Sequence, residues 1–156
     1  MRRNVMAMLV GLFTVLALGP GSVSAKPSAI PLNAEQETTG STSTGSGFFS
    51  YTIEGDQLCY TLEVRNLTMA PFAAHIHIGP RNVEGPIVVG LLTPPAATST
   101  VSACITAVEG ATGQALSTAE LAAIAADPRN YYVNVHTNNW PGGEVRGQLK
   151  SSGEPI

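Results

Sequence analysis

Large apolar residues recur at every second position along much of this 156-residue chain. Residues 58–64 show the pattern clearly, with one face formed by Leu58, Tyr60, Leu62 and Val64. This period of two is typical of a β-strand with one buried face. Connections that carry Gly and Pro separate seven segments of this kind: 48–53, 58–64, 72–78, 87–92, 101–108, 131–137 and 144–149. The pattern predicts an all-β sandwich or Greek-key barrel of about seven strands.

One segment has the pattern of a helix instead. Ser117 and Glu120 have the spacing of a capping box, in which each side chain bonds the backbone N–H of the other residue. Residues 121–126 are rich in strong helix formers, and Pro128 blocks continuation. We therefore predict one short helix over residues 117–126, inside a crossover between strands.

The N-terminus combines a basic start with a continuous apolar run. Arg2 and Arg3 precede residues 5–18, which are almost all apolar, and small residues occupy positions 23–25. This order is typical of a secretory signal peptide, which we predict over residues 1–25. A retained membrane anchor is the alternative, although the run is shorter than the roughly 20 residues of a spanning helix. No later segment has the length and apolarity to cross a membrane. We therefore expect a protein that is secreted or lies in the cell envelope.

Composition limits the number of domains and the kind of partner. Only 12% of the residues are charged, and the formal net charge is −3. Nucleic-acid binding needs clustered Lys and Arg, so no nucleic-acid partner is predicted. The length suits one domain, which we place at residues 30–149. Residues 26–47 are predicted to form a flexible N-terminal segment and the first strand region, and residues 150–156 a C-terminal tail.

The three histidines are the strongest candidates for chemistry. His75 and His77 alternate along a predicted strand, so both imidazoles face the same side. His136 ends another predicted strand. If these strands are neighbours, the three imidazoles converge into a site that suits zinc or copper, with an open position for water or a ligand. The alternative is a hydrogen-bonded polar cluster that holds two loops.

A second motif covers residues 141–149. Its Pro-Gly-Gly opening predicts a turn, and the following strand places Glu144, Arg146 and Gln148 on one face. Arg146 is a candidate for guiding an anion toward the histidines. It is also a candidate for a structural ion pair or a backbone hydrogen bond, with Glu63 or Glu144 as conceivable ion-pair partners.

Two cysteines exclude a disulfide-rich miniprotein and any Cys-rich metal site. Cys59 and Cys104 each lie opposite the apolar face of their predicted strands, so a bridge between neighbouring strands fits an exported protein. This bridge would close a loop of about 46 residues, and the chain-entropy model gives such a loop about 4 kcal/mol of stabilisation. Two free thiols are the alternative. Asn66 begins a glycosylation acceptor tripeptide, which matters only in a eukaryotic protein.

Several of these motifs together resemble the CHRD domain, which is named for its repeats in chordin and also occurs singly in bacterial exported proteins. The resemblance rests on residues 74–79, 85–89, 132–137 and 141–149, and Gln36 and Glu37 are similar to the opening strand region of the family. It implies an immunoglobulin-like or superoxide-dismutase-like sandwich. It implies no settled activity for single-domain members, and growth-factor binding by chordin does not transfer to this chain.

A weaker resemblance connects the chain to copper/zinc superoxide dismutase. His75, His77, His136 and Arg146 are similar in order and type to its copper ligands and its anion-guiding arginine. The chain has no fourth histidine to bridge copper and zinc, and no recognisable set of zinc ligands. The resemblance therefore does not extend to dismutase activity.

Two functions remain open at this point. The first is a non-catalytic exported domain that binds an unidentified extracellular or envelope ligand or has a structural role. The chain has no nucleophile motif and no phosphate loop, and few carboxylates lie near the histidines in sequence. The alternative is a copper- or zinc-binding metalloprotein, either a copper carrier or a dismutase-like oxidoreductase.

Overall fold

The computed structural model describes residues 28–151. The predicted signal peptide, residues 1–25, lies outside the described residues. So do the last residues of the predicted tail, 152–156. Within the described part of the chain, no helix is long and apolar enough to cross a membrane.

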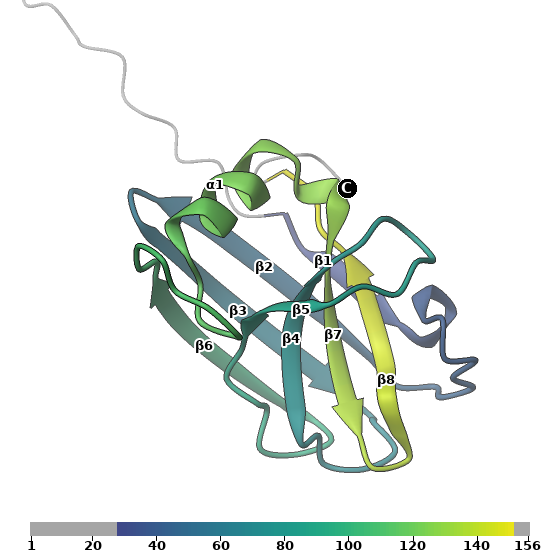
Figure 1. Cartoon of the computed structure of the whole chain (residues 1–156). Helices are drawn as coiled ribbons and strands as arrows, with labels where there is room; N and C mark the ends of the chain where they lie inside the picture. Colours follow the sequence, from purple (N-terminus) through teal and green to yellow (C-terminus); the bar gives the residue numbers. More distant parts are fainter. Residues whose placement is uncertain (1–27, 152–156) are drawn as a thin grey trace, which may run out of the picture.

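Among the described residues, eight strands form a single sheet in which every neighbouring pair is antiparallel. The strands are β1 (Ile30–Asn33), β2 (Ser46–Glu54), β3 (Gln57–Arg65), β4 (Ala73–Ile78), β5 (Ile87–Gly90), β6 (Ser99–Thr106), β7 (Tyr131–Thr137) and β8 (Trp140–Gln148). Their order across the sheet is β5-β4-β7-β8-β1-β2-β3-β6. Figure 1 shows the sheet curled, so that β4, β7 and β8 lie against β2, β3 and β6. The predicted all-β class is confirmed.

The short helix also matches its prediction. Helix α1 spans Thr118–Ala126, and the Ser117–Glu120 capping box is present at its start. Two short 3-10 turns, Ala34–Gln36 and Pro128–Asn130, are the other regular elements within residues 28–151. Figure 1 shows α1 across one end of the curled sheet. There Leu121 and Ile124 join the hydrophobic core.

Two strands, β1 and β8, differ most from the sequence prediction, while the bounds of the others shift by at most two residues. β1 is an eighth strand, within the segment that was predicted to contain the first strand region. It is only four residues long and contains Pro31, so alternation alone gives a weak signal. β8 begins at Trp140 and includes residues 141–143, where a turn was predicted. The pairing of β7 with β8 is irregular near this point. Gly143 has a φ of +137°, a conformation that glycine adopts without strain, so the strand continues through the irregularity.

The core lies inside the curl and follows the predicted alternation. In β3 the inward residues Leu58, Tyr60, Leu62 and Val64 are all buried. Ile76 of β4 and Val133 and Val135 of β7 face them from the other half of the sheet and have no exposed surface. The residues between them in sequence therefore lie on the outer face of the sheet. That outer face carries the histidines.

Candidate metal centre

The strand order brings the three histidines together. β4 pairs with β7, and His75 lies directly opposite Asn134 while Ala73 lies opposite His136. His136 is therefore diagonal to His75 on the same face. Each of the three imidazoles presents one nitrogen, and these three nitrogens all lie within 4.8 Å of one another. His75 Nδ1 and His136 Nε2 are only 3.1 Å apart.

Backbone carbonyls orient two of the rings. His77 Nδ1 lies 2.9 Å from the carbonyl oxygen of Gly85, and His136 Nδ1 lies 3.0 Å from that of Pro141. A carbonyl oxygen only accepts, so each Nδ1 carries the proton and donates it. Each Nε2 is then unprotonated: that of His77 has no hydrogen-bond partner among the described residues, and that of His136 faces His75 Nδ1. This arrangement is typical of metal-binding histidines, whose second nitrogen donates to a carbonyl or carboxylate.

The environment keeps these imidazoles neutral. Burial, together with the nearby His136 and His77, lowers the pKa of His75 to about 4, and burial is the largest of these causes. Burial also lowers the pKa of His77 and of His136, against the opposing effect of their carbonyl hydrogen bonds. Neutral imidazole is the form that binds metal ions. His75 is partly exposed, so the cluster opens on its side.

Arg146 lies close to the histidines but is only 1% exposed. Its Nη1 donates to the Val83 carbonyl at 3.0 Å and its Nη2 to the Pro80 carbonyl at 2.9 Å. Its guanidinium carbon lies 3.4 Å from the centre of the Tyr132 ring. Of the roles considered from the sequence, these contacts fit the backbone hydrogen bond. They do not fit anion guidance, which needs an accessible cation.

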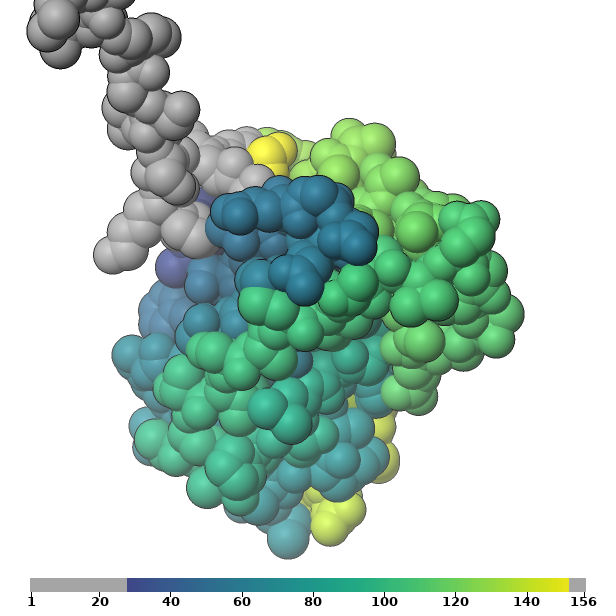
Figure 2. Space-filling view, turned by 90° about the vertical axis from the view of Figure 1, so that its left-hand side faces the viewer, coloured from purple at the N-terminus to yellow at the C-terminus, as the bar shows by residue number. Residues whose placement is uncertain are grey.

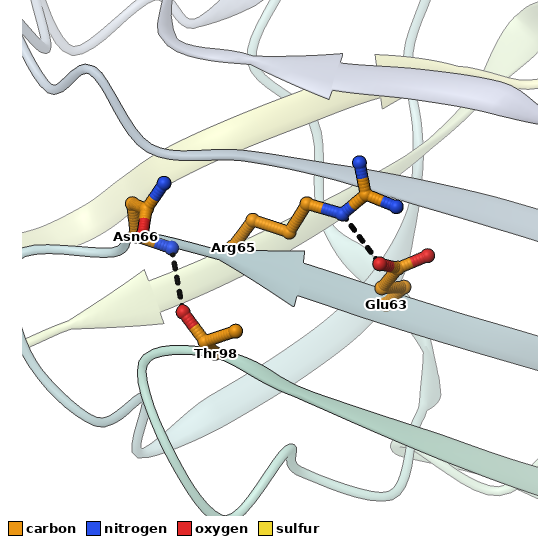
Figure 3. A network of polar contacts seen from close by, with 4 residues as sticks. All are labelled: Glu63, Arg65, Asn66 and Thr98. Atoms are coloured by element: carbon orange, nitrogen blue, oxygen red, sulfur yellow. Dashed lines mark hydrogen bonds and ion pairs between the residues drawn. The ribbon is translucent and has the colours of Figure 1, made fainter.

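The two conceivable ion-pair partners of Arg146 have other contacts. Glu63 pairs with Arg65 on β3, as Figure 3 shows. Glu144 is completely buried and accepts hydrogen bonds from the side chains of Ser43, Thr68 and Thr137 and from the Thr68 backbone. Burial raises the pKa of Glu144, but these hydrogen bonds together bring it below its ordinary value.

Gln148 completes the series of polar residues on the outer face of β8. Its amide nitrogen donates to the carbonyls of Gly79, Arg129 and Tyr131. Glu144, Arg146 and Gln148 therefore fasten different loops to the same strand. The sequence placed them on one face, but the backbone groups that they bond are all 17 or more residues away, and no local pattern identifies them.

Glu37 and Asn134 are two members of this face that the sequence analysis did not identify as functional candidates. Asn134 Nδ2 donates to Glu37 Oε1 at 3.0 Å, while Asn134 Oδ1 is buried and has no hydrogen-bond partner among the described residues. Burial raises the pKa of Glu37 to about 7, although Arg146 and the hydrogen bond from Asn134 act in the opposite direction. Alternation with Tyr132 and His136 was the available signal for Asn134. Glu37 comes from a distant loop, and its resemblance to the opening strand region of the family gave no indication that it reaches this face.

The outer face of the other half carries the cysteines. Cys59 of β3 lies opposite Cys104 of β6, and the two form a disulfide across the strands. Asn66 follows β3 in an exposed loop with a φ of +52°, and its backbone N–H donates to Thr98 Oγ1 at 2.9 Å (Figure 3). The disulfide prediction is confirmed, and this half contains no histidine.

The fold and the outer-face residues together define a small antiparallel β domain with a binding or structural role. The family model of the CHRD domain matches residues 29–149, most of the chain. The protein belongs to the CHRD-domain family. No curated protein and no solved structure matches the chain significantly.

Proposed function

We propose that this CHRD-domain protein is a non-catalytic binding domain whose ligand is a transition-metal ion, zinc or copper. His75, His77 and His136 would hold the ion. The observation that carries the proposal is the grouping of three imidazole nitrogens within 4.8 Å, two of the rings being fixed by backbone carbonyls. Three imidazoles suit both metals and leave a further coordination position open.

The state of His77 favours a metal site over a simple polar cluster. Its side chain is 7% exposed, and its Nε2 has no hydrogen-bond partner among residues 28–151. Burying an unsatisfied acceptor costs about 1–3 kcal/mol. A cluster that only held loops together would gain by satisfying this nitrogen. A metal ion bound at Nε2 removes that cost.

The contact between His75 and His136 indicates what metal binding would change. His136 Nδ1 donates to Pro141, so at their 3.1 Å contact His75 Nδ1 is the donor and His136 Nε2 the acceptor. A bound ion needs both nitrogens as donors of lone pairs, each at about 2.0–2.1 Å. His75 would therefore carry its proton on Nε2 in the metal-bound protein, or turn its ring. Its partial exposure allows either change.

Location is the second part of the proposal. The disulfide and the family fit an extracytoplasmic protein, since disulfides persist in oxidising compartments. We propose that residues 1–25 are a cleaved signal peptide and that the protein is secreted or stays in the cell envelope. N-terminal sequencing of the exported protein is expected to begin at Lys26. An uncleaved N-terminus would contradict this part alone.

Elemental analysis tests the metal site. Protein produced without a His tag is incubated separately with Zn²⁺ and Cu²⁺, desalted and analysed for bound metal. One ion per chain is expected for at least one metal, and clearly sub-stoichiometric amounts of both would overturn the proposal.

Single substitutions locate the bound ion. His136→Ala is expected to weaken binding at least tenfold, because it removes one of three protein ligands. Gln57→Ala, an exposed change on the other half of the sheet, is the control and is expected to bind as wild type does. Unchanged affinity in a folded His136→Ala variant would exclude the three-histidine site, even if metal binds elsewhere.

A further inference from the structure

The connection between β4 and β5, residues 79–86, lies over the histidine cluster and holds one of its rings. The carbonyl of Gly85 accepts the hydrogen bond from His77 Nδ1 at 2.9 Å. The Gly85 N–H also donates to the Tyr132 hydroxyl at 3.2 Å. A Cβ at Gly85 would lie 1.6 Å from the Ile78 carbonyl oxygen, so the chain passes β4 more closely than any side chain allows. The position of this carbonyl therefore depends on how the whole loop is held.

Arg146 fastens the middle of the same loop. Two of its nitrogens donate to the carbonyls of Pro80 and Val83, and Nη2 also donates to Gln148 Oε1 at 3.2 Å. A buried guanidinium is costly unless its N–H groups are satisfied. The planar fork of arginine suits two acceptors at fixed positions, which a lysine cannot match. The loop and Arg146 therefore stabilise each other.

A ring stack connects Arg146 to His77 by a second route. The guanidinium lies 3.4 Å from the centre of the Tyr132 ring, on which the His77 ring is stacked with centroids 4.8 Å apart and an interplanar angle of 13°. Tyr132 therefore lies between the cation and the imidazole. Arg146 limits the movement of His77 through this stack as well as through Gly85.

We propose that Arg146 is a positioning residue for the histidine cluster. Through residues 79–86 and Tyr132, it fixes His77 as the Nδ1–H tautomer and leaves Nε2 as the nitrogen for a ligand. Its consequence for metal affinity rests on the proposed function. Its consequence for His77 itself does not, because the hydrogen bond to Gly85 is present without metal.

The first experiment examines the metal-free protein. Nitrogen-15 NMR of the imidazoles reports which nitrogen of His77 carries the proton, and amide hydrogen exchange reports the order of residues 79–86. In wild type, His77 is expected as a single Nδ1–H tautomer with a protected loop. Arg146→Ala and Arg146→Lys are expected to give a mixture of tautomers and faster exchange confined to this loop. Arg65→Ala removes an exposed arginine from β3 and is the charge-matched control.

The second experiment measures zinc affinity by competition with a chromophoric chelator. Loss of a group that orients a ligand typically costs about 10- to 100-fold in metal affinity. We expect about a tenfold loss for Arg146→Ala, a smaller loss for Arg146→Lys, and none for Arg65→Ala. Tyr132→Phe keeps the ring stack and loses the hydroxyl contact to Gly85, so a small loss is expected. If Arg146→Ala does not fold, Arg146→Lys and Tyr132→Phe carry the test.

The outcomes separate this inference from the proposed function. An unchanged His77 tautomer and unchanged loop exchange in a folded Arg146→Lys variant would overturn the positioning role. An equal loss of affinity in Arg65→Ala would also overturn it, by showing a general charge effect. If wild type binds no metal but the His77 tautomer depends on Arg146, the proposed function fails and the positioning role stands.

Discussion

The outer face of this one sheet has two halves of opposite character. Over β4, β7 and β8, the outward side chains are polar and mostly buried, as at His77, Asn134 and Arg146. Over β2, β3 and β6 the outward side chains are at least partly accessible to solvent, as at Thr61 and Ser102, which hydrogen bond to each other. Figure 2 looks at the β6 side, where the green segments that include β6 lie at the surface beside the blue β2–β3 hairpin.

The lengths of the connections explain this difference. β2 and β3 are joined by a tight turn at Gly55 and Asp56, which leaves no chain to cover their outer face. The longer connections 34–45 and 79–86 lie on the other half (Figure 1). There Ser41 of the first connection donates to the Glu144 carbonyl of β8, and Arg146 of β8 donates to the Val83 carbonyl of the second. A covered face can hold neutral histidines and a buried arginine because the loops supply hydrogen-bond partners. Such polar burial is a property of the loops as much as of the strands.

Removing the disulfide, which joins β3 to β6 in the solvent-accessible half, should give the largest effect on stability. The double variant Cys59→Ala, Cys104→Ala opens a covalent loop with a sequence separation of 45. We expect a loss of about 4 kcal/mol in the free energy of unfolding, measured by chemical denaturation. Metal affinity should stay as in wild type under conditions where the variant is folded. A fall in affinity would show that the two halves are coupled.

Each half contains a glycine with positive φ, Gly143 in β8 and Gly55 in the turn between β2 and β3, so the same substitution can be made in both. A Cβ at Gly143 would lie 2.4 Å from Asn134 Nδ2 and 2.6 Å from Glu37 Oε1, whereas a Cβ at Gly55 meets nothing within 4 Å. Gly143→Ala combines backbone strain with overpacking and should cost about 3 kcal/mol. Gly55→Ala carries the strain alone and should cost about 1 kcal/mol. Equal losses in thermal or urea unfolding would argue that the covered face is loosely packed.

Two glutamates allow the same chemical change in each half. Glu144→Gln removes the charge from a fully buried acceptor of four hydrogen bonds, and should cost about 2 kcal/mol. Glu63→Gln changes an exposed ion pair with Arg65 and should cost less than about 0.5 kcal/mol. Urea denaturation of both variants at pH 7 gives the two values. A loss of similar size in both would contradict the contrast between the halves.

A small effect is expected in the pH dependence of stability, from Glu37 beside β7 and β8. The pKa of Glu37 is raised from 4.5 to about 7, so its folded state favours the protonated form and loses stability as pH rises from about 4.5 to 7. Glu37→Gln removes this contribution, whereas the histidine contributions are common to both proteins. The variant should gain about 1 kcal/mol relative to wild type between pH 5 and pH 8, a value discounted for the partial exposure of Glu37. A difference that does not change with pH would show that Glu37 is solvated.

Local sequence patterns were enough to predict much of the fold. Alternation gave the inward faces of the strands, because the pleat fixes a period of two whatever the neighbouring strand is. Alternation also placed His75 and His77 on the same face of one strand, and placed Cys59 and Cys104 each opposite the apolar face of its strand. The Ser117–Glu120 box gave the start of α1, since capping involves only residues of the first turn. These features depend on residues close together in the chain.

Tertiary structure decided the rest. His136 joins the other histidines only because β7 pairs with β4, a choice that depends on the packing of the whole sheet. The partners of Arg146 are backbone carbonyls 63 and 66 residues away. Every residue has a backbone carbonyl, so no side-chain pattern identifies which of them Arg146 bonds. Sequence therefore determined which residues face outward. The positions of the covering loops determined which of those residues became a buried site.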